Sequence, residues 1–260
     1  MSQPLVLSLF PGIGLLDMAF EEEGFCVVRG PDLLWGGDIR RFHPPRGRFD
    51  GVIGGPPCQL FSQMRHIQPL AGQKHGNLIP EFERVVGEAV PSWFVMENVR
   101  DAPLPTVPGY FVQAQLLKDV WVGGETMRMR RISFGSSDGR SLGIEQVALH
   151  TQEPEVAALA GGGNRSVPVA LVRDGKGGQR PKQYGNSGPR TALGRGGSSV
   201  EGFALKLRQQ GLPADFLSEA PFTSQGKSKA VGNGVPLPMG RAIAKAVRRT
   251  VYPETLELGA

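Results

Sequence analysis

The order of hydrophobic and polar positions predicts alternating strands and helices in the first half of the chain. Short apolar runs at residues 4–10, 25–28, 50–53 and 92–96 are typical of buried strands. The first run leads through a turn rich in glycine into residues whose apolar side chains have helical spacing. Strands that alternate with helices predict an α/β fold built on an open sheet.

Helical periodicity recurs further along the chain. It predicts helices over residues 79–90, 112–120 and 201–210, and a final helix near the C-terminus. Residues 126–135, in contrast, are typical of a strand. Residues 161–199 are dense in glycine and have little helical periodicity, so they predict turns, short strands or loop.

Length, composition and charge narrow the class of protein. A chain of 260 residues, 40% of them hydrophobic, can bury a sizeable core in one large domain or in a large and a small one. It has neither an apolar run near the ~20 residues of a membrane span nor the basic start of a signal peptide, so a cytoplasmic protein is expected. The net charge of +5 is compatible with a polyanionic partner. Two cysteines without a CxxC pair, and only four histidines, argue against a zinc site or a disulfide framework, and no metal is expected.

Cys58 is the first candidate for chemistry. It follows the predicted strand at residues 50–53 after Gly54, Gly55, Pro56 and Pro57, which exclude both a helix and a strand ladder. Side chains at the carboxyl ends of strands in an open α/β sheet line the crevice where ligands bind. A thiol there is a candidate nucleophile, although a small buried residue after a tight turn explains the same position.

Charged side chains lie on one later predicted strand and directly after another. Glu97 directly follows the predicted strand at residues 92–96, and the chain between Cys58 and Glu97 is long enough for one helical crossover. Such a crossover brings both strand ends to the same edge of the sheet. Arg128 and Arg130 alternate on a predicted strand and therefore point to one face, where both can reach the cleft.

The turn after the first strand suits a nucleotide-like ligand. Gly12 and Gly14 stand between the strand and the helix, a layout that brings backbone N–H groups and a helix N-terminus to a ligand. A glycine pair after a strand is a weak signal on its own.

Six motifs in chain order resemble those of the DNA cytosine-5 methyltransferases, over about residues 5–135 and 203–247. The chain is identified as a small member of bacterial or phage type. Two positions depart from the family pattern, because Leu15 replaces the last glycine of the first motif and Thr126 replaces a glutamine. The matching runs are Phe10-x-Gly12-x-Gly14, Gly37-Asp38-Ile39, Pro56-Pro57-Cys58-Gln59, Glu97-Asn98-Val99, Arg128-x-Arg130 and Gly232-Asn233-Gly234-Val235-Pro236.

The resemblance implies the fold and the division of the chain. The family has an S-adenosylmethionine-dependent, Rossmann-like methyltransferase sheet with a smaller target-recognition domain inserted into it. By this resemblance, residues 1–135 and 230–252 form the catalytic and cofactor-binding domain, and residues 136–229 form the target-recognition domain. The family also implies that the partner is double-stranded DNA and that the chain is a monomer.

The resemblance also implies roles for individual residues. The Cys58 thiolate would add to C6 of a flipped-out cytosine, the acid form of Glu97 would face N3, and Arg128 and Arg130 would contact the base carbonyl and a flanking phosphate. Asp32 is the best candidate to bind the ribose of S-adenosylmethionine. The full set expected to hold this cofactor is Phe10, Gly12, Ile13, Gly14, Asp32, Asp38, Ile39, Pro56, Leu78, Asn233 and Val235.

Two other functions fit the same motifs. An RNA (tRNA) cytosine-5 methyltransferase on this scaffold would use Cys58 and Glu97 in the same way. A catalytically inactive DNA-binding relative would keep the fold, and the changes at Leu15 and Thr126 leave that reading open.

Overall fold

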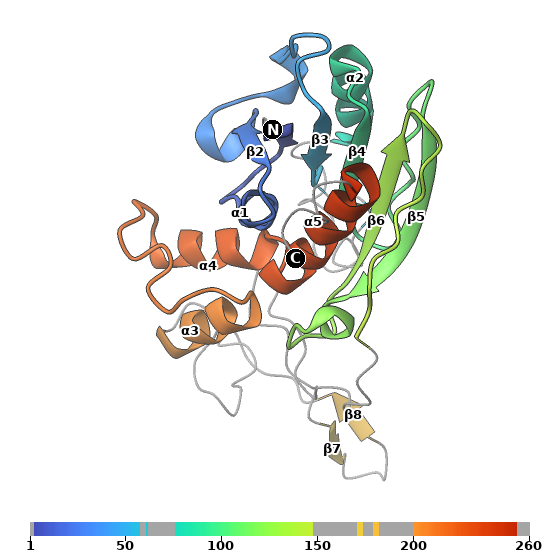
Figure 1. Ribbon diagram of the computed structural model, residues 1–260. Coiled ribbons are helices and arrows are strands. Elements are labelled where there is room, and N and C mark those ends of the chain that lie inside the picture. Colours follow the sequence, from blue (N-terminus) through green and yellow to red (C-terminus); the bar gives the residue numbers. More distant parts are fainter. Residues whose placement is uncertain are drawn as a thin grey trace.

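The computed structural model describes residues 3–57, 61, 76–147 and 200–253, and the backbone of two short strands, β7 and β8, between the last two ranges. Six described strands form one sheet in the order β2-β1-β3-β4-β6-β5, and β7 and β8 form a separate hairpin. The pairs β2–β1, β1–β3 and β3–β4 are parallel, whereas β6 is antiparallel to both β4 and β5 (Figure 1). The strands are β1 (Leu5–Leu9), β2 (Cys26–Arg29), β3 (Gly51–Gly54), β4 (Trp93–Asn98), β5 (Phe111–Lys118), β6 (Met129–Ser136), β7 (Leu171–Arg173) and β8 (Gln179–Pro181).

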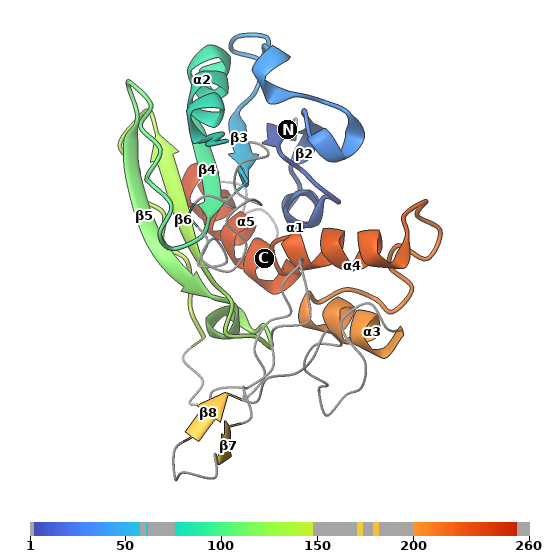
Figure 2. The ribbon, with the colours of Figure 1, turned by 180° about the vertical axis from the view of Figure 1, so that it is seen from behind.

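Helices cover both faces of the sheet (Figure 1, and from behind in Figure 2). On one face, Val6 and Ile53 belong to a buried cluster with side chains of α1 and α5. On the other, their neighbours Leu7 and Val52 belong to a second cluster with side chains of α2. The α-helices are α1 (Leu15–Glu22), α2 (Ile79–Ala89), α3 (Val200–Gln209), α4 (Ser224–Asn233) and α5 (Leu237–Val251), and the 3₁₀ turns are η1 (Leu33–Trp35), η2 (Ile39–Arg41) and η5 (Asp119–Val122).

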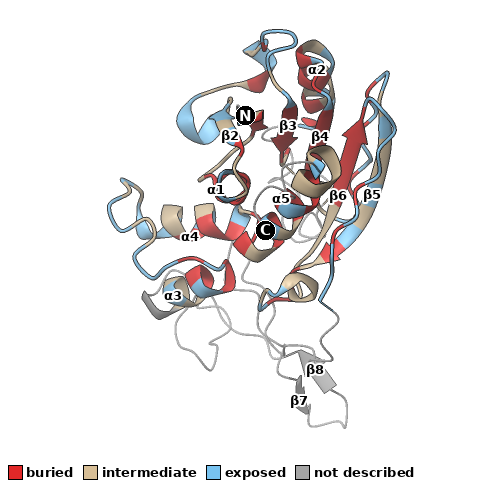
Figure 3. Ribbon diagram, viewed as in Figure 1, coloured by how far each residue is buried: buried red, intermediate tan, exposed pale blue. Residues whose placement is uncertain are grey.

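The pattern-based strands and most helices are confirmed. The four apolar runs of the first half become β1 to β4, and Figure 3 shows the central strands β3 and β4 buried. The helix predicted at residues 79–90 is α2, whose buried residues Phe82, Val85, Val86 and Ala89 form its apolar face. The helices predicted at residues 201–210 and near the C-terminus are α3 and α5.

The helix predicted at residues 112–120 is wrong. This segment is β5, which pairs along its whole length with β6. Its sequence is compatible with both a helix and a strand. The apolar spacing suits a helix, yet Gln113 and Gln115 alternate with Val112 and Leu116 as in a strand. Pairing with β6 decides in favour of the strand, because it provides hydrogen-bond partners for the backbone groups along β5. Such tertiary contacts override a weak local propensity.

Helix α4 was not predicted either. It contains Gly226 and Gly232, which lower helix propensity, and its N-terminus is fixed by a side chain. The hydroxyl of Thr223 accepts a hydrogen bond from the Gly226 N–H at 3.1 Å, which is a helix N-cap.

The last helix returns to the first. α5 packs along α1, with Ile243, Ala244 and Val247 buried. The two helices approach closely, because a Cβ on Gly240 would lie 2.9 Å from Cβ of Ala19. Leu207, from the segment assigned by resemblance to the target-recognition domain, is buried in the same cluster. The domain division itself stays a prediction. No helix of the described residues is long and apolar enough to cross a membrane.

Candidate active site

The parallel strands β1, β3 and β4 end at one edge of the sheet, and three of the six motifs follow or complete these ends. The glycine turn follows Leu9, and the Gly-Pro-Pro run follows Gly54. Asn98, the last residue of β4, is buried and donates a hydrogen bond from Nδ2 to the Pro56 carbonyl at 3.1 Å. This bond ties the end of β4 to the segment that leads to Cys58. Cys58 itself lies outside the described residues.

The turn after β1 has an unusual backbone. Phe10, Gly12 and Gly14 have φ values of 57°, 56° and 81°, in the left-handed region. Such a conformation is uncommon for phenylalanine, and it concentrates at functional sites. Apart from its two chain neighbours, no other residue in the described part of the chain has an atom within 4 Å of a Cβ placed on Gly12, so the space that a side chain would fill is open. The turn therefore offers room for a ligand beside its backbone, as the glycine pattern predicts.

Asp32 reaches this turn. One carboxylate oxygen accepts the Gly12 N–H at 2.8 Å, and the other accepts the Leu34 N–H at 2.7 Å. Trp35, in the same loop, donates from Nε1 to the Gly12 carbonyl at 2.7 Å. The predicted ribose ligand is thus next to the glycine turn, but both of its oxygens already accept backbone hydrogen bonds. Each carboxylate oxygen has a second lone pair that can accept from a ligand.

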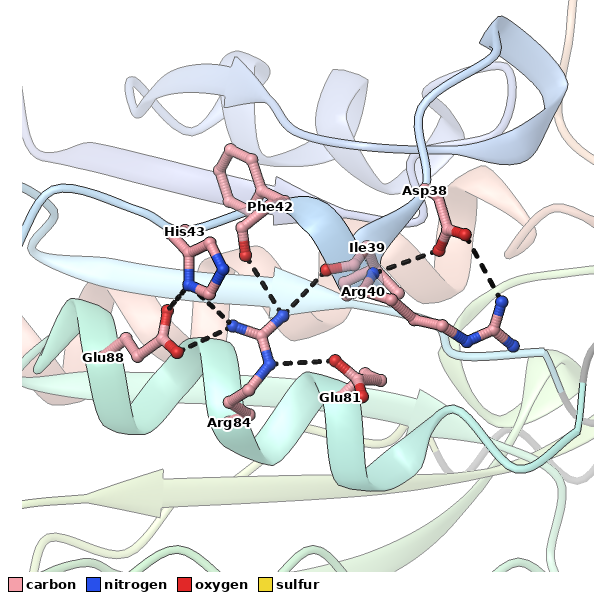
Figure 4. A network of polar contacts seen from close by, with 8 residues as sticks. All are labelled: Asp38, Ile39, Arg40, Phe42, His43, Glu81, Arg84 and Glu88. Atoms are coloured by element: carbon pink, nitrogen blue, oxygen red, sulfur yellow. Dashed lines mark hydrogen bonds and ion pairs between the residues drawn. The ribbon is translucent and has the colours of Figure 1, made fainter.

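Asp38 and Ile39 form the start of the turn η2. The Asp38 carboxylate caps this turn by accepting the Arg40 N–H at 3.0 Å, and the Arg40 guanidinium lies 3.4 Å away (Figure 4). The hydrogen bond from the Arg40 backbone, followed by the charge of its side chain, lowers the pKa of Asp38 from its ordinary value. Asp38 is therefore an anionic acceptor at neutral pH, while Ile39 is buried.

Glu97 lies against the loop that leads to Cys58. A Cβ placed on Gly55 would be 3.1 Å from Oε2 of Glu97. Oε1 of Glu97 forms an ion pair with Nε of Arg130 at 2.7 Å, and the two side chains are only 12% and 18% exposed. The predicted carboxyl and one of the two predicted arginines therefore meet at the strand edge from which Cys58 continues.

Arg128 has a different partner. It precedes β6 and donates from Nη1 to the Gly232 carbonyl at 2.9 Å, so it links β6 to the end of α4. Thr126, one of the two positions that depart from the family pattern, is buried and donates from Oγ1 to the Asp119 carboxylate at 2.7 Å. Burial raises the pKa of Asp119, although the hydrogen bonds from Thr126 oppose this change.

The other departure, Leu15, has a matching small residue. Leu15 is the first residue of α1 and is buried, and its side chain packs against Gly234 at the end of α4. A Cβ on Gly234 would lie 2.5 Å from Cδ1 of Leu15. The bulk added at Leu15 is thus offset by the absence of a side chain at Gly234.

The remaining candidate residues lie around these motifs. Val235 is buried just after α4, whereas Asn233 at the end of that helix is exposed. Leu78 and Pro56 are buried, and Ile13 packs partly buried against the core of α1 and α5. Among the described residues, no group of His, Cys, Asp and Glu side chains is arranged to hold a metal.

The sequence interpretation missed a polar cluster behind the glycine turn. Asp17 on α1 is fully buried, accepts a hydrogen bond from the Ser8 hydroxyl, and pairs with Nε of Arg29 at 3.0 Å. Burial raises the pKa of Asp17, against the effects of Ser8 and Arg29. The Arg29 guanidinium in turn covers Gly14, whose Cβ would lie 2.6 Å from it. A lone Asp in the first turn of a helix is an ordinary helix-start signal, so nothing in the sequence marked it.

Comparisons with known proteins agree with the motifs. Residues 36–104 match the family model described as C-5 cytosine-specific DNA methylase. The chain is 32% identical over 111 residues to the Type II methyltransferase M.FnuDI of Fusobacterium nucleatum, a match that covers 36% of this chain and 32% of that protein. It is 30% identical over 112 residues to the Type II methyltransferase M.NgoPII of Neisseria gonorrhoeae, covering 36% of this chain and 33% of that protein. The match thus spans about a third of the length of these curated relatives.

Solved structures match over nearly the whole chain. A putative DNA modification methyltransferase encoded within a prophage of E. coli superposes with a TM-score of 0.60 at 16% identity, covering 96% of this chain and 99% of that one. The Entamoeba histolytica methyltransferase EhMeth superposes with a TM-score of 0.59 at 10% identity, again covering 96% and 99%. At such identities the likeness concerns the fold alone, and it confirms the predicted Rossmann-like methyltransferase fold.

Proposed function

We propose that this chain, a member of the DNA cytosine-5 methyltransferase family, transfers a methyl group from S-adenosylmethionine to C5 of cytosine in DNA. The observation that carries this proposal is the position of the Glu97–Arg130 pair against Gly55, at the strand end from which Cys58 continues. A carboxyl group and a guanidinium beside the segment that continues in sequence to a cysteine suit nucleophilic addition to a heteroaromatic ring.

The residues around the glycine turn fit S-adenosylmethionine. The open space beside Gly12 accommodates a ligand near the backbone, and Asp32 and Asp38 are acceptors for hydroxyl and amino groups. We assign the cofactor to these residues together with Phe10 and buried Ile39. When bound, S-adenosylmethionine supplies an electrophilic methyl group on a sulfonium.

The chain's own residues would activate the cytosine. The thiolate of Cys58 forms a bond to C6, and the ring electrons that this addition displaces make C5 nucleophilic. When the base binds, the Glu97 carboxylate takes up a proton and shares it with N3 in a hydrogen bond, which stabilises the charge that develops on the ring. Arg130 holds the Glu97 carboxyl in place through Nε at 2.7 Å. After methyl transfer, loss of the C5 proton to a base and release of the Cys58 thiolate restore the aromatic ring.

The substrate has to present an extrahelical base. C5 and C6 of a stacked cytosine are out of reach inside a duplex, so the target base is flipped out. The net charge of +5 favours binding to the phosphate backbone.

We further assign target recognition to residues 136–229, the segment that contains β7 and β8. Removal of residues 165–198 is then expected to change sequence choice or DNA affinity and to spare cofactor binding. Loss of cofactor binding would contradict this division of the chain.

Covalent trapping tests the proposed chemistry. A duplex with 5-fluorocytosine at the target position cannot lose its C5 substituent, so the adduct to the thiolate should persist after methyl transfer. We expect an adduct that survives denaturation, requires S-adenosylmethionine, and maps by peptide mass spectrometry to Cys58. The same chain with Cys58→Ala is the control. An adduct on RNA alone would favour the RNA methyltransferase, and cofactor and DNA binding without any adduct would favour an inactive relative.

A further inference from the structure

Arg84 connects helix α2 to the turn that carries Asp38. Its Nη2 donates to the carbonyl of Ile39 at 2.8 Å and to the carbonyl of Phe42 at 3.1 Å (Figure 4). These carbonyls lie at the start of the turn η2 and directly after it. One guanidinium nitrogen thus holds both ends of the turn that Asp38 caps.

The guanidinium is itself fixed from α2. Nε pairs with Glu81 at 2.9 Å and Nη1 pairs with Glu88 at 2.8 Å, one helical turn to either side of Arg84. His43 Nδ1 lies 3.0 Å from Glu88 and 3.4 Å from Nη1, which extends the network back to the residue after Phe42. The Arg84 side chain is only 28% exposed. Two carboxylates therefore set the direction in which Nη2 points.

The segment around η2 depends on such contacts. Between β2 and β3, η1 and η2 are the regular elements of the described backbone, so few main-chain ladders fix its position. Ile39 is 2% exposed and anchors the segment from inside. Arg84 supplies the polar anchor, and the two together determine where the Asp38 carboxylate points. A planar guanidinium with several N–H donors suits this task better than an ammonium group.

We infer that Arg84 is a positioning residue for the cofactor: it holds the turn η2 so that Asp38 and Ile39 present a preformed surface to S-adenosylmethionine. This inference rests on the proposed function, because it takes Asp38 as a cofactor ligand. Arg84 acts through Asp38 and Ile39 and has no contact of its own with the reacting atoms. Its loss should therefore weaken cofactor binding and leave the chemical step at saturating cofactor unchanged.

The test compares three variants of the full chain. Arg84→Met removes both backbone contacts, and Arg84→Lys keeps the charge but loses the planar fork. Arg241→Met is the matched control, since Arg241 pairs with Glu22 at 2.6 and 2.9 Å between α5 and α1, away from η2. Hydrogen exchange without cofactor reports on the turn itself. Calorimetry with S-adenosylhomocysteine reports on binding, and steady-state kinetics separate KM from kcat.

The N–H groups of Arg41 and Phe42 donate within the turn, to the carbonyls of Asp38 and Ile39. In Arg84→Met, we expect these two amides to exchange faster than in the wild type. Its affinity for S-adenosylhomocysteine should fall at least tenfold, its KM for S-adenosylmethionine should rise in parallel, and kcat should stay within about twofold. The exchange rates, affinity and KM of Arg84→Lys should lie between those of Arg84→Met and the wild type. Arg241→Met should behave as the wild type in all three measurements. If Arg84→Met does not fold, Arg84→Lys is judged by the same measurements.

Two results separate failure of this inference from failure of the proposed function. Wild-type affinity in the Arg84 variants, with the wild-type chain binding cofactor, would overturn the positioning role alone. A wild-type chain that does not bind S-adenosylhomocysteine or S-adenosylmethionine would refute the proposed function, and the inference with it. A fall in kcat without a change in KM would also overturn the inference, because it would place Arg84 in the chemical step.

Discussion

The contact between Leu15 and Gly234 leads to a sharp stability prediction. Gly234 has φ −69° and ψ 162°, which any residue adopts, so Gly234→Ala brings no backbone penalty. Reduced freedom of the unfolded chain would favour alanine by about 0.4–1 kcal/mol. The new Cβ, however, would lie 2.5 Å from Cδ1 and 3.0 Å from Cγ of Leu15, a side chain that is only 2% exposed. Overpacking of this kind costs about 1–3 kcal/mol, so Gly234→Ala should lower the free energy of unfolding by about 1–2 kcal/mol.

A double-mutant cycle isolates the cause. Leu15→Ala alone should cost about 2–5 kcal/mol, since it empties a buried site. In that background the added methyl group of Gly234→Ala meets only the Cβ of residue 15, at an ordinary contact distance of 3.5 Å, and it should be neutral or stabilising by up to about 1 kcal/mol. The two changes should therefore couple by about 1–3 kcal/mol. Urea unfolding followed by circular dichroism gives all four free energies.

The refuting result is additivity. If Gly234→Ala costs the same in both backgrounds within about 0.5 kcal/mol, Leu15 is not what excludes a side chain at position 234. The view that Gly234 offsets the lost glycine of the first motif would then be wrong.

Three further predictions concern single residues. Gly14→Ala should lower the melting temperature and weaken S-adenosylhomocysteine binding, because the φ of Gly14 is 81° and a Cβ there would lie 2.6 Å from the Arg29 guanidinium. A melting temperature and an affinity for S-adenosylhomocysteine equal to those of the wild type, both measured by calorimetry, would contradict it. Glu97→Gln should lower kcat by about 10²–10⁴ with little change in cofactor affinity, and a kcat near that of the wild type would remove Glu97 from the chemistry. Lys206 is 3% exposed, it donates to the Ser228 hydroxyl, and burial lowers its pKa. Because a buried charge is costly, Lys206→Met should raise the free energy of unfolding at pH 7 by about 1 kcal/mol. This gain should shrink as pH rises towards 10.5, because the folded chain releases the Lys206 proton before the unfolded chain does; a gain that stays constant from pH 7 to 10 would contradict it.

The sequence predicted the frame of the site because that frame follows from simple rules. Parallel strands that alternate with helices end at one edge, so the residues after β1, β3 and β4 had to meet there. The same rule placed Glu97 beside the loop that leads to Cys58. The buried stripe of α2 was readable from its period, since Phe82, Val85 and Val86 face one side.

The contacts that orient the site were not readable in this way. In the sequence, Arg84 is one of several charged residues in the predicted helix at residues 79–90. Its bonds to the Ile39 and Phe42 carbonyls depend on how a loop distant in sequence folds back. The bond from Gly12 to Asp32 likewise joins two turns whose geometry no periodicity encodes. The strand β5 was missed because its apolar spacing suits two periods and its pairing with β6 decides between them.

We propose that the chain methylates cytosine in DNA through Cys58. The most direct measurement is base-resolution mapping of cytosine methylation in DNA from cells that lack C5 methylation of their own and express this chain. A Cys58→Ala chain, shown to be folded and equally abundant, is mapped in parallel. We expect methylation at C5 of cytosines within one short sequence, and its loss in the variant. An unmethylated genome in cells with abundant, folded wild-type protein, or equal methylation by the variant, would contradict it.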